Sequence, residues 1–252
     1  MNMSLIIFGI AKNSLSHAQS SLLIETLYKE SGISLDLFRY KEIVFIFADY
    51  HEANYSMSRD DLLRYAHVIE HLAKSISLLP MRYKSLANST DQLSEHAEKG
   101  YHQILTNLEL IDHKEEFAVR VLRSPSAADN EDGTHIGTDE HQLQDALSGD
   151  SPSRIYLRTK YAAFKAEELR AVYSENVKRK FIEDLAPISL FYEFKKRLSP
   201  STVMDAVVLV DKDKRKALSD LIAGMQKFYP QHNILMTGPW PPYSFANIDI
   251  QL

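Results

Sequence analysis

Cysteine is absent from the 252 residues of this chain, which excludes disulfides, thiol catalysis and cysteine-ligated metals. Glycine occurs only eight times, and the glycine-rich phosphate loops G-x-x-x-x-G-K-[ST] and G-x-G-x-x-G are both missing. The G-x-S-x-G turn of serine hydrolases is missing too. The sequence therefore gives no support to the commonest nucleotide-binding and hydrolytic sites.

Long apolar runs and an excess of basic charge are also lacking. No stretch approaches the roughly 18 apolar residues of a membrane span, and the opening MNMSLIIFGIAK is more typical of a strand than of a secretion signal. The formal net charge of −5 argues against a general binder of nucleic acid or anionic membranes. We therefore expect a cytoplasmic protein that binds neither nucleic acid nor membrane.

The first part of the chain predicts a mixed α+β domain over residues 1–112. Apolar runs and alternation predict strands at 4–10, 33–40 and 42–48. Ser58 followed by Asp61 resembles a capping box, and it opens a helix with one apolar stripe that ends before Pro80. A second helix is predicted over 90–110, whereas residues 20–28 fit either a short helix or a strand.

The second part predicts a βαββαβ order over residues 113–245. The predicted elements are a strand at 117–122, a helix at 154–185, strands at 189–197 and 203–210, a helix capped by Asp213 and running to 228, and a strand at 234–237. This order is the ferredoxin-like split arrangement, in which two helices cover one face of a four-stranded sheet.

A polar insertion interrupts this second domain at residues 124–153. It holds seven acidic residues, no lysine or arginine, and few large apolar side chains. Such a segment buries too little surface to offset its ordering entropy, so we expect it to be mobile and solvated. Residues 246–252 are expected to form a C-terminal tail.

One metal-binding pattern occurs, in the predicted helix after Ser58. His67, Glu70 and His71 form H-x-x-E-H, the inverted zincin pattern, which would make the chain a zinc hydrolase with Glu70 as base. The apolar stripe of this helix runs through Ile69 and Leu72, which leaves the three polar residues beside or opposite the core. A solvated polar face is the preferred interpretation, and we expect no catalytic residues, no metal and no cofactor.

The most specific signal lies near the C-terminus. The sequence TGPWPPYSF holds the single tryptophan between three prolines and resembles the signature of the GvpL/GvpF family of gas vesicle accessory proteins. Further segments are similar to that family in the same order: YAHVIEHLA, LLPMRY, YHQILTNLELIDHKEEFAVRVL and SRIYLRTKYAAF. The resemblance covers about residues 5–245 and is weakest in the acidic insertion.

The resemblance implies a fold, a role and two groups of site residues. It implies two domains, the second a modified ferredoxin-like fold, and a non-enzymatic role in building gas vesicles through contacts with the shell protein GvpA and other accessory proteins. The signature residues are Gly238, Pro239, Trp240, Pro241, Pro242, Tyr243 and Phe245, with a secondary group of Pro80, Arg82 and Tyr83. Lys84 stands where the family commonly has glycine, which predicts a different turn there.

Two interpretations of the C-terminal signature remain open. In the first, which we prefer, Pro239 to Pro242 form a rigid polyproline-like brace that buries Trp240, Tyr243 and Phe245 and fixes the angle between the domains. In the second, the segment is a preformed ligand for a partner. A different class of function, a regulatory module that binds a small ligand on a ferredoxin-like fold, is the alternative to the assembly role.

Overall fold

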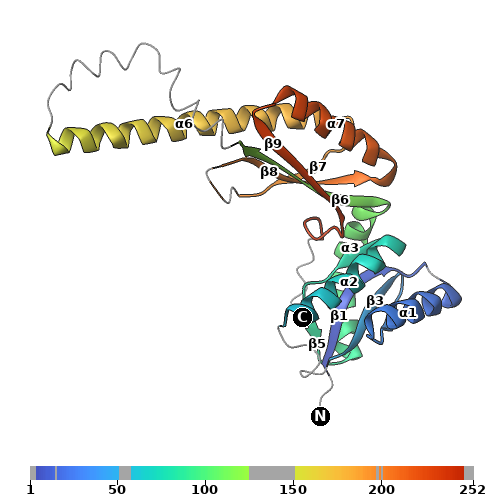
Figure 1. The fold of residues 1–252 in the computed structure, drawn as a ribbon. Coiled ribbons are helices and arrows are strands. Elements are labelled where there is room, and N and C mark those ends of the chain that lie inside the picture. The colour runs from blue at the N-terminus through green and yellow to red at the C-terminus, as the bar shows by residue number, and fades with distance from the viewer. Residues whose placement is uncertain are drawn as a thin grey trace. The chain divides into compact units, whose positions relative to one another are not determined.

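The chain folds into two units, each with its own sheet (Figure 1). The computed structural model describes residues 4–14, 16–50, 58–124, 151–196, 199 and 201–246. The first unit comprises Met1–Phe117 and Gly238–Leu252, and the second comprises Ala118–Thr237. The predicted mixed α+β class is confirmed. The predicted boundaries differ from these units, because they placed residues 113–117 and 238–245 in the second domain and 246–252 in a separate tail.

A sheet with strand order β2-β3-β1-β4, to which β5 adds by pairing with β1, forms the centre of the first unit. The elements of this unit are β1 (Ser4–Lys12), α1 (His17–Ser31), β2 (Asp36–Tyr40), β3 (Ile43–Tyr50), α2 (Arg59–Ser75), β4 (Leu78–Pro80), β5 (Leu86–Ala87) and α3 (Thr90–Ile111). The pairs of β1 with β3, β4 and β5, and of β2 with β3, are antiparallel.

Strand β1 is buried along nearly its whole length, as its continuous apolar run predicts. Its register with β3 shifts between Ile7 and Gly9. A Cβ atom at Gly9 would lie 2.6 Å from Leu78 Cδ1 and 2.8 Å from the Leu79 carbonyl oxygen. Glycine is therefore required where β4 approaches β1.

The helices of this unit start at side-chain caps. Ser16 and Gln19 form a capping box at α1, and Gly32 ends that helix in the left-handed region at φ 72°. This local chemistry makes residues 20–28 helical, which the apolar pattern alone left open. The predicted cap of α2 is confirmed, because Ser58 Oγ accepts a hydrogen bond from the Asp61 amide.

The second unit holds β6 (Lys114–Arg123), α6 (Pro152–Leu185), β7 (Phe191–Phe194), β8 (Thr202–Asp211), α7 (Arg215–Phe228) and β9 (His232–Trp240), with β6 and β9 beginning or ending in the first unit. Its strand order is β7-β8-β6-β9. Helices α6 and α7 contact each other and both contact β8, whose residues are nearly all buried (Figure 1). The predicted order of elements is thus confirmed.

Two details of this unit differ from the prediction. Asp213 does not cap α7; it lies in a short 3₁₀ turn, Lys212–Lys214, and the helix begins after Lys214 without a side-chain cap. Most of the predicted insertion, residues 125–150, lies outside the described residues. Among the helices that the structure does describe, none has both the length and the apolar character required to cross a membrane.

Candidate functional site

The C-terminal signature is a continuation of strand β9 followed by turns, and not the predicted polyproline rod. Strand β9 runs on through Pro239 to Trp240, past the point where the prolines were expected to end it. After the strand, the Tyr243 amide donates to the Pro241 carbonyl at 2.7 Å, and the Phe245 amide donates to the Pro242 carbonyl at 3.2 Å. These two short-range bonds fold the backbone back on itself.

The aromatic side chains of the signature are more exposed than the brace interpretation requires. Trp240 is 45% exposed and Tyr243 is 44% exposed, whereas Pro241 and Pro242 are buried. The expectation that the single tryptophan is buried is therefore wrong. It rested on the average behaviour of tryptophan, but here the adjacent prolines occupy the interior and leave the indole partly in solvent.

Glu116, on β6, anchors this segment within the first unit. Its two carboxylate oxygens accept hydrogen bonds from Ser244, one from the backbone amide at 2.8 Å and one from Oγ at 2.9 Å. Glu116 is only 6% exposed, and its own carbonyl oxygen lies against Gly238. Sequence reasoning missed this residue, although a glutamate next to the apolar residues Phe117, Ala118 and Val119 was a signal that its carboxylate needs a partner.

Tyr243 has a perturbed acidity in this setting. Burial of the phenol raises the pKa of Tyr243 to about 12, and the negative charge of Glu70 on α2 adds to the rise. Both effects disfavour the phenolate in the folded protein. The phenol of Tyr243 therefore stays neutral in the folded protein to a higher pH than in the unfolded chain.

The raised pKa of Tyr243 predicts a loss of stability at alkaline pH. An unfolded tyrosine ionises near pH 10, so between about pH 10 and 12 the unfolded chain loses a proton that the folded chain keeps, and the free energy of unfolding falls as pH rises. We expect Tyr243→Phe to reduce this fall by about 1 kcal/mol, well under the full linkage value because the side chain is partly exposed. Urea unfolding at pH 9 and pH 11.5 measures it, with Tyr28→Phe on α1 as control. Equal pH dependence in wild type and Tyr243→Phe would contradict the assignment.

The secondary signature lies around a different residue, Tyr65 of α2. The hydroxyl of Tyr65 lies within 3.1 Å of three carbonyl oxygens, those of Ile7, Met81 and Arg82. The ring of Tyr83 meets that of Tyr65 edge to face, with centroids 5.1 Å apart. Burial, as the largest cause, raises the pKa of Tyr83.

The remaining residues of the secondary signature act through their backbone near Tyr65. Pro80 is buried at the end of β4, where it pairs with Gly9 of β1, and the Arg82 carbonyl also accepts a bond from the Ser85 amide. Lys84 adopts φ 64°. The left-handed conformation that favours glycine is thus present although the glycine is not.

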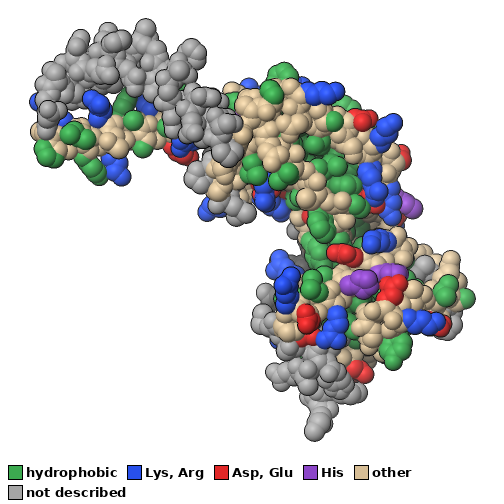
Figure 2. All heavy atoms as spheres, viewed as in Figure 1, with side chains coloured by type: hydrophobic (Ala, Val, Ile, Leu, Met, Phe, Trp, Pro, Cys, Tyr) green, Lys and Arg blue, Asp and Glu red, His purple; other side chains and the backbone are tan. Residues whose placement is uncertain are grey.

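The histidine pattern has a partner that the sequence did not reveal. His67 Nε2 lies 3.3 Å and His71 Nδ1 lies 3.0 Å from the same atom, Oε2 of Glu30, which is in the last turn of α1. Figure 2 shows histidine side chains next to acidic ones on the visible face of the first unit. Glu70, the base of the zincin pattern, is not a member of this cluster and instead influences Tyr243. The two histidines lie at the surface, as expected, but they are not simply solvated.

Helix α6 carries an apolar stripe that the described residues of its own unit leave exposed. Leu157, Tyr161 and Phe164 follow one another at the i, i+4, i+7 spacing of a single helical face, and each is between 49% and 66% exposed. Its buried residues lie in the second half: Ser174, Val177, Phe181 and Leu185. Residues 152–166 also hold four basic side chains and no acidic one. The first half of α6 thus presents apolar and cationic groups together.

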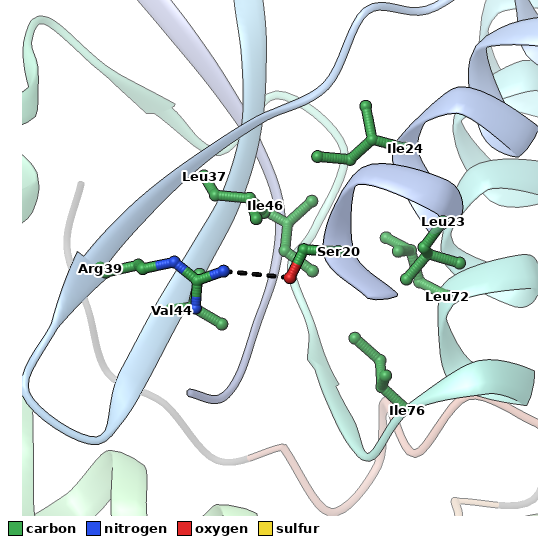
Figure 3. A pocket seen from close by; sticks show the side chains of 9 residues that line it. All are labelled: Ser20, Leu23, Ile24, Leu37, Arg39, Val44, Ile46, Leu72 and Ile76. Carbon is green, nitrogen blue, oxygen red and sulfur yellow. Dashed lines mark hydrogen bonds between the residues drawn. The ribbon is translucent and has the colours of Figure 1, made fainter. Parts of the chain in front are cut away.

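A small apolar pocket in the first unit has room for about one water molecule. Its volume is about 20 Å³, and it lies between α1, α2 and the sheet. Arg39 closes one side by donating to Ser20 Oγ at 3.0 Å (Figure 3). Pockets that hold drug-sized ligands have roughly 300–1,000 Å³, so this one does not support the small-ligand alternative.

Comparison with known proteins gives consistent matches. A sequence model of the family "Gas vesicle synthesis protein GvpL/GvpF" matches residues 4–247. Gas vesicle protein L of Streptomyces sp. strain CB03234 is 25% identical over 188 residues, which span 72% of this chain and 66% of that protein. Gas vesicle protein F1 of Halobacterium salinarum is 30% identical over 76 residues, 30% of this chain and 36% of that protein.

Solved structures show the same fold over nearly the whole chain. The crystal structure of the gas vesicle protein GvpF from Anabaena sp. PCC7120 has a TM-score of 0.79 at 15% identity, with 98% of this chain and 99% of that chain covered. GvpF from Microcystis aeruginosa has a TM-score of 0.72 at 13% identity, with 98% and 100% covered. Since the family match extends over every described residue, this chain belongs to the gas vesicle synthesis protein GvpL/GvpF family.

Proposed function

We propose that this protein is a non-enzymatic accessory or minor structural protein required for gas vesicle assembly. It acts in the cytoplasm, at the gas vesicle, through contacts with the shell protein GvpA and with other accessory proteins. Membership of the GvpL/GvpF family supports the role. The exposed apolar stripe of α6 is the observation that carries the proposed mode of action.

The stripe suits a partner with apolar surface. Leu157, Tyr161 and Phe164 stand on one side of a helix, and exposed apolar groups of this kind mark protein interaction sites. An amphipathic helix gains about 25 cal/mol for each Å² of apolar surface that a partner removes from water. The neighbouring basic residues Arg154, Arg158, Lys160 and Lys165 limit self-association by mutual repulsion and orient acidic groups of a partner.

The second unit is, in this proposal, a ferredoxin-like platform for the helix. The order of its elements and the strand order β7-β8-β6-β9 support this assignment. Ser174 Oγ donates to the Val203 carbonyl at 2.6 Å, and Phe181 and Leu185 are fully buried, so the second half of α6 is held firmly on the sheet. The platform can then present the first half of the helix as a rigid rod.

The C-terminal signature is proposed as a second contact surface. Trp240 and Tyr243 present partly exposed rings on a backbone fixed by buried Pro241 and Pro242. Tryptophan and tyrosine dominate the binding energy of many interfaces, and a fixed backbone lowers the entropy lost on binding. This supports the partner interpretation of the signature over the brace.

The α6 stripe can be tested by adding charge to it. Leu157→Glu with Phe164→Glu should reduce co-purification with co-expressed GvpA at least tenfold and abolish gas vesicle formation, because two carboxylates would have to be desolvated at the interface. The melting temperature should stay within about 2 °C of wild type, since both side chains are exposed.

A matched control adds the same charge to the other face of the same helix segment. Thr159→Glu with Ala162→Glu leaves Leu157, Tyr161 and Phe164 intact and should retain both GvpA and vesicles. If the stripe variant still bound GvpA and formed vesicles at the wild-type level, α6 would not be the contact surface. If both variants lost binding equally, net charge and not the stripe would be responsible, which also contradicts the proposal.

A further inference from the structure

We propose that Glu30, His67 and His71 form a binding site for a divalent transition-metal ion, with Zn²⁺ as the best-suited ion. The bound ion fastens the end of α1 to the middle of α2. This inference is independent of the role in gas vesicle assembly, because it rests on three side chains of the first unit and concerns the stability of that unit.

The distances fit a single ion. Zn²⁺ binds histidine nitrogen and carboxylate oxygen at about 2.0–2.2 Å in a tetrahedral arrangement, which separates neighbouring ligand atoms by about 3.3 Å. Oε2 of Glu30 lies 3.3 Å from His67 Nε2 and 3.0 Å from His71 Nδ1. One ligand atom from each of the three residues lies within 4.8 Å of the others. Only small side-chain adjustments are needed to place all three around one ion.

The backbone positions these ligands in advance. His67 and His71 are one helical turn apart on α2, so they project from the same face. The rings are inclined by 59° with centroids 6.4 Å apart, and one nitrogen of each ring lies beside the Glu30 carboxylate of α1. Glu30 and His67 are 37 positions apart in the sequence. The three ligands therefore join two helices through residues that are far apart in the sequence.

The electrostatic setting favours a cation. Glu30 occupies the last turn of α1, where the helix dipole places partial negative charge, so its carboxylate is in an unfavourable position that a positive ion would relieve. The adjacent basic residue, Lys29, donates to Glu25 at 2.7 Å. Imidazole ligands select Zn²⁺, Cu²⁺, Ni²⁺ or Co²⁺ over Mg²⁺ and Ca²⁺, which prefer all-oxygen sites.

The site is assigned to binding and not to hydrolysis. The zincin pattern needs Glu70 as a base next to the metal, but Glu70 is outside the cluster and its charge acts on Tyr243. All three ligands are partly exposed at the surface. The fourth position of a tetrahedral ion would be taken by solvent water, which completes a clip between the helices.

Metal titration of the full chain tests the site. Protein freed of metal with a chelator is titrated with Zn²⁺ in competition with a chromogenic chelator, and separately with Mg²⁺. We expect one Zn²⁺ per chain, no saturable Mg²⁺ binding, and a melting temperature about 5–10 °C higher at a hundredfold excess of Zn²⁺ over its dissociation constant. Co²⁺ should give the visible absorption of a tetrahedral site.

Single substitutions distinguish Zn²⁺ binding at this site from Zn²⁺ binding by other histidines of the chain. Glu30→Gln and His71→Ala should each weaken Zn²⁺ binding at least tenfold and reduce the thermal shift at the same Zn²⁺ concentration to about half or less. Glu70→Gln on the same helix and His102→Ala on α3 are controls that should bind like wild type. Glu30→Gln keeps the shape of the side chain, so it remains informative if His71→Ala folds poorly.

Two results would contradict the proposal. If Zn²⁺ binding were unchanged in Glu30→Gln, the ion would not join α1 to α2. If wild type bound Zn²⁺ no better than His71→Ala, the three residues would be only a hydrogen-bonded cluster, with both imidazoles on one carboxylate, and the proposal would be wrong.

Discussion

Gly238→Ala is expected to lower the free energy of unfolding by about 3–5 kcal/mol. Gly238 has φ +129°, a conformation that side chains rarely adopt. A Cβ atom there would lie 2.8 Å from the Glu116 carbonyl oxygen and 2.9 Å from Phe117 Cδ1. The nearest of these atoms belongs to the backbone, so it cannot rotate away. The strand would have to separate from β6 or change its backbone angles.

The measurement is chemical denaturation of Gly238→Ala beside Gly224→Ala. Gly224 lies in α7, and an added Cβ atom would meet nothing within 4 Å. That control should gain up to about 1 kcal/mol, because alanine is favoured over glycine in a helix. If Gly238→Ala lowers the free energy of unfolding and Gly224→Ala raises it, the loss is due to the close packing around Gly238 and not to the glycine-to-alanine change as such. A loss below 1 kcal/mol for Gly238→Ala would mean that β9 and β6 are not packed in this way.

Arg120→Met should be the second most damaging change, with a loss of about 2–4 kcal/mol. Arg120 on β6 donates to Oδ2 of Asp205 on β8 through Nε at 2.9 Å and through Nη2 at 2.6 Å. The Asp205 side chain is 7% exposed, so without the guanidinium its charge would be buried and unpaired. The expected loss is below the largest reported for buried pairs because Arg120 itself is partly exposed.

A double-mutant cycle tests the cause of that loss. Arg120→Met with Asp205→Leu removes the buried charge together with its partner, and should recover at least half of the stability lost in Arg120→Met. Lys195→Ala, which breaks an exposed pair with Glu193, should cost under about 0.5 kcal/mol. If the double variant were less stable than Arg120→Met alone, lost packing and not the unpaired carboxylate would explain the result.

The sequence predicts best those features that depend on residues close together in the chain. The Ser58 cap of α2, the burial of Ile69 and Leu72 on its stripe, and the strand at 203–210 depend on neighbours within a few residues, and the structure confirms all three. The apolar spacing of residues 20–28 suits either a helix or a strand. The capping box of Ser16 and Gln19 is the feature that identifies them as helical. Asp213 shows the converse, since a suitable capping residue can be followed by a 3₁₀ turn instead.

Contacts between distant residues were beyond sequence reasoning. The pairing of Glu116 with Ser244 and the approach of Glu30 to His67 and His71 join residues far apart in the chain, so no periodicity points to them. Trp240 was misjudged for a related reason. Its exposure depends on which neighbouring side chains fill the interior, and the two prolines that follow it do so instead.

The return of the chain to the first unit at Gly238 has a consequence for the order of synthesis. Residues 118–237 leave the ribosome before the segment that completes the earlier unit. Until Ser244 is made, the Glu116 carboxylate lacks the two hydrogen bonds that Ser244 donates. A premature stop codon before the codon of Ser244 would thus harm the part of the protein that was translated first.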